Sequence, residues 1–462
     1  METVLLYYMV FCAVMFGALL LARIPGPAGP QWQLTPEFTL AASFLFYTSA
    51  MPISRVFWGT PGTDLDIAFL QTHTLAGLGI ICGLYMGKYL APERRRPERS
   101  RPPNPMSPIR CVAFAGSAFL AVGGFIYYRV GFDLSNLLTP YGFEQSISTS
   151  ATGSTFEILM LPGAIATFVS CYYGAFFRHR PILWLRRLVI ALTILFTAAL
   201  LVRGSRNLTV IVWAPIAVLA LRGRRLPILK SVLVAAAAFF VFSAVAVIRN
   251  VGFGEAESQT VTSDNLDPLR GELGTSYNVY TIFDSITTAE DLRYGGTYVI
   301  DFAANLVPRV FWPNRPNSTA VKFSMLYYQT DNLEFGIGFS PVVEALTNFS
   351  IVGILPVFAA FSFLVVIAAR YLRSKGRWGY LSYSMMVPML VNWNRIDSNA
   401  SGKMFVVYVL LFVVLDRLLY SVSADWGLRP VRAAGGSGYT PIIQVMGAIP
   451  RHPLRTRQSH PQ

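Results

Sequence analysis

Arginine residues recur beside the ends of long apolar runs in this chain. Arg203 and Arg206 stand in the short connection RGSRN, Arg249 follows another run, and Arg395 stands in NWNRIDSN. Guanidinium groups stay charged and bind phosphate oxygens through paired hydrogen bonds, so several of them can hold a pyrophosphate without a divalent metal. The alternative is that these side chains only contact lipid headgroups, as cations at the ends of membrane helices often do.

The stretch GFSPVVEALTNF supplies Glu344 as the candidate general base. Glu344 stands just before an apolar run at 349–369, so it lies at the expected membrane boundary, where a carboxylate could take a proton from an attacking hydroxyl. Its other interpretation is a first-turn acid that complements the dipole of its helix. Asp301 is instead expected to pair with Asn305 or Arg309 on its own helix.

A Pro-rich stretch, VPRVFWPNRPNS, adds Arg309, Trp312 and Arg315, and YGGTY adds Tyr294 and Tyr298. The two arginines could join Arg203, Arg206, Arg249 and Arg395 in one arginine cage around an anion, or they could contact a lipid phosphate or a loop carbonyl. Aromatic side chains of this kind are typical of membrane interfaces.

The composition of the chain indicates a membrane protein. Of its 462 residues, 53% are hydrophobic and only 13% are charged, a balance unlike that of a soluble globule. The net charge of +14 comes from short clusters scattered between apolar runs. Such clusters are typical of the loops that set the orientation of a membrane protein, and we therefore exclude nucleic acid as a partner. The sequence contains no P-loop, H-E-x-x-H or C-x-x-C motif, and we therefore expect neither a cofactor nor a metal.

Spanning helices need roughly 20 mostly apolar residues. The sequence contains eleven such runs, at 4–22, 38–54, 67–87, 111–128, 157–177, 188–202, 207–221, 231–248, 349–369, 379–393 and 404–421. If the N-terminus lies outside and the runs alternate, the strong Lys/Arg clusters all fall on the cytoplasmic side, within 88–110, 178–187, 222–230, 370–377 and the basic tail. Lys/Arg-rich loops are normally cytoplasmic. The isolated arginines then share the outer face, where two cations in so short a turn as RGSRN favour an anion site.

The expected organisation is therefore an all-α polytopic integral membrane protein of about eleven transmembrane helices. Residues 1–248 hold the first eight, with a cytoplasmic Arg/Pro-rich linker at 92–110; residues 348–421 hold the last three, and residues 422–462 form a cytoplasmic basic tail. Between them, 249–347 form a large periplasmic loop, which we interpret as a lid. Apolar spacing predicts two amphipathic helices in this loop, one between Gly271 and Leu292 and one from Thr297 to a stop or kink at Pro308.

The motifs RGSR, YGGTY, LVPRVFWPNRPNS and GFSPVVEALTNFSIVG, in this order around a long outer loop, resemble those of the O-antigen polymerase (Wzy-type) family of bacterial oligosaccharide repeat-unit polymerases. The likeness covers roughly Leu200 to Phe363, and the remainder matches only in hydropathy. The family commonly has lysine where this chain has Arg315, a change that keeps the charge but alters its geometry.

The resemblance implies a glycosyltransferase on a GT-C-like scaffold at the periplasmic face of the bacterial inner membrane. It would transfer a growing glycan from undecaprenyl pyrophosphate to a second lipid-linked repeat unit, with inversion and without a metal, to build O-antigen, capsule or exopolysaccharide. The arginine cage would hold the departing pyrophosphate, Glu344 would be the base, and Tyr294, Tyr298 and Trp312 would contact sugars. Partners would be undecaprenyl-pyrophosphate-linked glycans and membrane lipids, with a chain-length regulator and a flippase as further candidates.

Two other functions stay open. An O-antigen ligase would use the same chemistry to move finished glycan to another acceptor. A lipid-linked-oligosaccharide flippase or other transporter would place charges at mid-membrane depth along a path. Because the apolar runs are nearly free of charge and the polar residues gather at one face, the sequence favours an enzyme.

Overall fold

The structure of the chain is a computed structural model that describes residues 2–23, 34–57, 64–90, 107–129, 132, 159–176, 182–202, 206–221, 279, 282, 292–307, 312, 314, 316, 322, 339–396 and 398–420. These residues contain helices and no strand. The chain divides into two units, Met1–Val422 and Ser423–Gln462, and every described residue belongs to the first.

The long helices coincide with all but one of the predicted apolar runs. They are α1 (Glu2–Arg23), α2 (Pro36–Phe57), α3 (Asp64–Tyr89), α4 (Pro108–Arg129), α7 (Leu161–Phe176), α8 (Leu183–Val202), α9 (Arg206–Ala220), α15 (Pro341–Ser374), α16 (Gly376–Trp393) and α17 (Ser398–Tyr420). The run at 231–248 lies outside the described residues. Among those described, α1, α3, α4, α8 and α15 are long and apolar enough to cross a membrane. The chain is thus a helical membrane protein.

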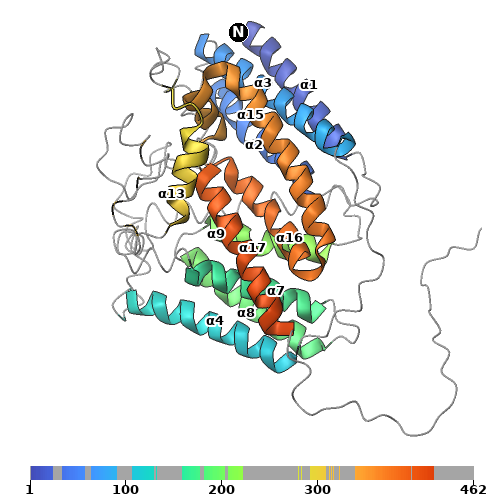
Figure 1. The fold of residues 1–462 in the computed structure, drawn as a ribbon, viewed down its shortest axis with the longest axis vertical. Helices are drawn as coiled ribbons and strands as arrows, with labels where there is room; N and C mark the ends of the chain where they lie inside the picture. The colour runs from blue at the N-terminus through green and yellow to red at the C-terminus, as the bar shows by residue number, and fades with distance from the viewer. Residues whose placement is uncertain are drawn as a thin grey trace, which may run out of the picture. The chain divides into compact units, whose positions relative to one another are not determined.

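Glycine residues of α3 let α15 approach it closely. A Cβ at Gly79 would lie 2.6 Å from the carbonyl oxygen of Leu355, and one at Gly83 would lie 2.2 Å from that of Ala359. Small residues at four-residue spacing allow membrane helices to pack with their backbones in contact. Helix α1 covers another side of α3, while α16 packs against α17, α9 and α2 (Figure 1).

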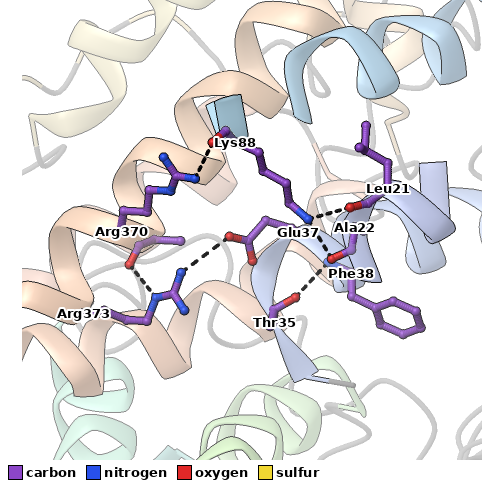
Figure 2. Close-up of polar contacts among 9 residues, drawn as sticks. Leu21, Ala22, Thr35, Glu37, Phe38, Lys88, Arg370 and Arg373 are labelled. Atoms are coloured by element: carbon purple, nitrogen blue, oxygen red, sulfur yellow. Dashed lines mark hydrogen bonds and ion pairs between the residues drawn. The ribbon is translucent and has the colours of Figure 1, made fainter. Parts of the chain in front are cut away.

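Lys88, in the last turn of α3, joins the ends of three helices. Its ammonium group donates hydrogen bonds to the carbonyl oxygens of Leu21 and Ala22 at the end of α1, the second at 2.9 Å. Arg370, near the end of α15, donates to the carbonyl oxygen of Lys88 at 2.9 Å (Figure 2). Cations at these positions satisfy terminal carbonyls and complement the helix dipoles.

The same end of the assembly includes the starts of α2 and α16. Glu37, in the first turn of α2, lies 3.9 Å from the guanidinium of Arg373 in the last turn of α15 (Figure 2). Arg377 at the start of α16 pairs with Asp416 near the end of α17. All of these helix ends are ones that the alternating topology assigns to a single side. The opposite ends of α15, α16 and α17 carry the residues considered next.

Candidate functional site

Helix α15 is broken at Ser350. This residue has φ 60° and ψ −166°, a backbone region that glycine adopts and other residues avoid, so α15 consists of a short helix, 341–349, and a longer one, 351–374. Ser340 caps the short helix by accepting a hydrogen bond from the Val342 N–H, and Pro341 occupies its first turn. The close approach across the break requires Gly353, because a Cβ there would lie 2.1 Å from that of Phe349.

The segment that precedes the predicted lid helix satisfies carbonyls that the break leaves free. The N–H groups of Arg293 and Tyr294 donate to the carbonyl oxygens of Thr347 and Asn348, both at 3.0 Å. The backbone reaches them through a turn in which Tyr294 has φ 46° and Gly295 has φ 83°. Unpaired carbonyls are costly where water is absent. These bonds therefore fix residues 292–307, which we call the lid segment, to the end of the short helix.

Glu344 lies at the centre of a buried polar network. Its carboxylate oxygen Oε1 accepts a hydrogen bond from the Thr297 hydroxyl at 3.1 Å. The Asn348 amide nitrogen donates to the same hydroxyl oxygen at 2.6 Å and to the Glu344 carbonyl at 2.7 Å, while its Oδ1 accepts from the Thr297 N–H at 3.4 Å. The side chains of Glu344, Thr297 and Asn348 are all fully buried. Because an amide nitrogen can only donate, Asn348 directs the Thr297 proton to Glu344.

The second carboxylate oxygen of Glu344 meets the start of α17. Oε2 accepts a hydrogen bond from the Ser398 N–H at 2.9 Å. Trp393, at the end of α16, holds the same residue by donating from its indole nitrogen to the Ser398 hydroxyl at 2.9 Å. Glu344 therefore complements the N-terminal end of a neighbouring helix as well as standing in the first turn of its own.

Arg395 lies at the same end of the helices as Glu344. Its carbonyl oxygen accepts from the Phe339 N–H at 3.0 Å, just before the short helix begins. Its guanidinium donates to the side-chain oxygen of Asn207 in the first turn of α9. Arg206 opens α9 beside Asn207, so the structure brings Arg395 and the backbone of Arg206 together. The side chain of Arg206 lies outside the description, as do Arg203, Arg249, Arg309 and Arg315.

The predicted lid helix from Thr297 is present. It begins as a π-helical turn, η7 (Thr297–Asp301), continues as α13 (Phe302–Leu306), and ends before Pro308. Three of its apolar side chains, Val299, Ile300 and Leu306, are exposed, whereas its polar side chains Thr297, Asp301 and Asn305 are buried. This distribution suits a helix whose apolar side faces lipid at an interface. The predicted helix between Gly271 and Leu292 falls almost entirely outside the described residues.

Two contacts of the lid helix involve residues outside it. Asp301 forms an ion pair with Lys322 at 2.9 Å, a partner outside its own helix. Phe302 packs on Gly402 of α17, where a Cβ would lie 2.9 Å from the phenyl ring. The lid helix is docked against the short helix of α15 through Thr297 and Glu344, and against the start of α17 through Phe302 and Gly402.

The three aromatic candidates differ in their surroundings. Tyr298 stacks on Phe349, with ring centroids 6.4 Å apart. Burial, followed by the negative charge of Glu344, raises the pKa of Tyr298 well above the usual value, so this hydroxyl keeps its proton at neutral pH. Tyr294 and Trp312 are exposed at 67% and 44%.

Ser350→Gly is expected to stabilise the protein. Glycine adopts the Ser350 backbone conformation without steric cost, so the substitution should relieve strain of order 1 kcal/mol, which appears as a higher melting temperature in detergent. Ser350→Ala keeps the Cβ and serves as the matched control, with no such rise. Equal melting temperatures for the two variants would contradict a strained break.

Sequence reasoning does not single out Thr297, Asn348, Ser398 or Asn207 as site residues. One signal was present for Asn348, which follows Glu344 by four residues and so shares its helix face. Nothing local marks the others, since their contacts join segments far apart in the chain. No family model matches this chain, and no curated protein or solved structure resembles it significantly.

Proposed function

We propose that the protein is a glycosyltransferase that polymerises undecaprenyl-pyrophosphate-linked oligosaccharide repeat units at the periplasmic face of the bacterial inner membrane. The product would be an O-antigen, capsule or exopolysaccharide. The proposal includes the full set of about eleven spans and a GT-C-like arrangement of them. One observation carries it: a buried carboxylate, Glu344, and the arginine-bearing helix ends at Arg395 and Arg206 meet at one end of the helices.

The reaction needs a base on one side of the reacting sugar carbon and charge stabilisation on the other. A hydroxyl of the acceptor sugar attacks C1 of the growing chain, and its proton passes to Glu344 as the new C–O bond forms. The bond from C1 to the pyrophosphate breaks, and the electron pair leaves with the pyrophosphate. Arg203, Arg206, Arg249 and Arg395 would stabilise that negative charge, with Arg309 and Arg315 added from the loop.

The distribution of charge supports the proposed side of the membrane. The Lys88, Arg370, Arg373 and Arg377 contacts lie at the opposite end of α15 and α16 from Glu344 and Arg395. Basic clusters of membrane proteins are normally cytoplasmic. This separation supports a periplasmic position for Glu344 and Arg395.

A transporter of lipid-linked oligosaccharide is the second candidate, and the break in α15 favours it. Discontinuous helices often form the substrate sites of secondary transporters, because unwound backbone groups can bind ligand there. In this chain the carbonyls of Thr347 and Asn348 at the break are bonded to the backbone of Arg293 and Tyr294, and they are not offered to a substrate. We therefore place the transporter second.

The glycan profile of a deletion strain tests the proposed function. Loss of a polymerase should leave a single repeat unit on the final acceptor, because ligation continues without extension. Loss of a ligase or of a flippase should leave no repeat unit there. A bare acceptor in the deletion strain, restored by the wild-type chain, would therefore contradict the polymerase assignment.

A further inference from the structure

Glu344 and Asn348 surround the Thr297 hydroxyl in the way that a base and an orienting amide surround a nucleophile. The hydroxyl hydrogen points to Oε1 of Glu344, 3.1 Å away, and the Asn348 amide donates to the hydroxyl oxygen at 2.6 Å. A general base must lie within hydrogen-bond reach of the proton that it removes. The Asn348 orientation is fixed by its two further bonds, to the Thr297 N–H and the Glu344 carbonyl.

Full burial of Glu344 rules out access by an acceptor sugar while the lid segment, residues 292–307, is docked. Thr297 belongs to this lid segment, and its hydroxyl donates to Glu344 Oε1. An acceptor hydroxyl that approached Oε1 would have to take the place of the Thr297 hydroxyl. The lid segment is held by backbone bonds at Arg293 and Tyr294 and by packing of Phe302 on Gly402.

We propose that the Thr297 hydroxyl occupies the position of the acceptor hydroxyl, so that Glu344 Oε1 and the Asn348 amide form the acceptor-binding subsite and the docked lid closes it. The inference rests on the proposed function. The ligand of this subsite is an alcohol, the free hydroxyl of the terminal sugar on the lipid-linked acceptor. When the lid segment lifts, the acceptor hydroxyl accepts from Asn348 and donates to Glu344, and its proton moves to Glu344 as the glycosidic bond forms.

The first test compares Thr297→Val with Thr297→Ser in the purified full chain. The substrate is the lipid-linked repeat unit extracted from the deletion strain. Valine removes the competing hydroxyl, so KM for the repeat unit should fall about three- to tenfold, the range expected for one lost hydrogen bond, with kcat retained. Serine keeps the hydroxyl and should match the wild type. A lower kcat in Thr297→Val, with KM unchanged, would overturn the inference, because Thr297 would then assist the reaction.

The second test crosslinks the lid segment in its docked position. It remains informative if Thr297→Val does not fold. Phe302→Cys and Gly402→Cys are combined in a chain whose four native cysteines are replaced by alanine, and a bifunctional methanethiosulfonate joins the two thiols. Crosslinking should abolish polymerisation and reduction should restore it, whereas the same reagent should not change the activity that each single-cysteine variant had before treatment. Full activity of the crosslinked protein, or failure of the thiols to crosslink, would overturn the inference.

The two proposals fail in distinguishable ways. If the wild-type chain forms no polymer from the extracted repeat unit, the proposed function itself is wrong. If the wild type is active and either test gives its contrary result, only the acceptor subsite is wrong.

Discussion

Glu344→Gln is expected to lower chain extension by about 10²- to 10⁴-fold, the usual contribution of a general base. Glutamine has nearly the same shape as glutamate, but it cannot take the proton of the acceptor hydroxyl. The measurement is the length distribution of glycans in a deletion strain that carries the variant. We expect single repeat units in place of the wild-type ladder.

A folding control is necessary because glutamine offers one oxygen where Thr297 and Ser398 donate to two. The loss of one buried hydrogen bond costs roughly 1–3 kcal/mol, so the amount of variant protein in the membrane must be measured together with its glycans. Normal abundance with single repeat units supports the base. Normal abundance with a full ladder would contradict a general base at Glu344. This residue would then only stabilise the helix N-terminus at Ser398.

Arg206→Ala is expected to lower chain extension by about 10²- to 10³-fold, comparable to the loss of one group that stabilises a developing negative charge. Arg206 opens α9 beside Asn207, which Arg395 contacts. Arg203→Ala should act similarly if both guanidinium groups hold the leaving pyrophosphate. Arg206→Lys should recover only part of the activity, since an ammonium cannot form the paired hydrogen bonds of a guanidinium.

Arg187→Ala is the matched control for this series. Arg187 is an exposed arginine of α8 on the side that the topology makes cytoplasmic, and its removal should leave the ladder unchanged. Wild-type ladders from both Arg203→Ala and Arg206→Ala, with the proteins present in the membrane, would show that these arginines only contact lipid.

The helices of this protein follow from the sequence because apolar runs of membrane length leave the backbone few alternatives. The break in α15 at Ser350 could not be predicted from the sequence. Its sequence, TNFSIVG, contains no proline at the break, and the strained conformation is held by contacts from Arg293, Tyr294 and Gly353. Such contacts depend on how segments far apart in the chain meet, which hydropathy does not reveal.

The candidate site was predictable to a similar extent. The sequence predicts Glu344 and Arg395 as site residues because each stands beside an apolar run at the expected outer membrane boundary, where a carboxylate can act as a base and a guanidinium can bind phosphate. The partners themselves, Thr297 and Ser398 for Glu344 and Asn207 for Arg395, are neutral groups of common types. Only the packed structure distinguishes them from the other serine, threonine and asparagine residues of the chain.

The most direct test of the polymerase assignment uses the purified protein in detergent, with lipid-linked repeat units from the deletion strain and EDTA in excess. No membrane separates two compartments under these conditions, so transport alone changes nothing. We predict glycans of two or more repeat units, with one undecaprenyl pyrophosphate released for each new bond. Repeat units that stay single, with no carrier released, would contradict the assignment.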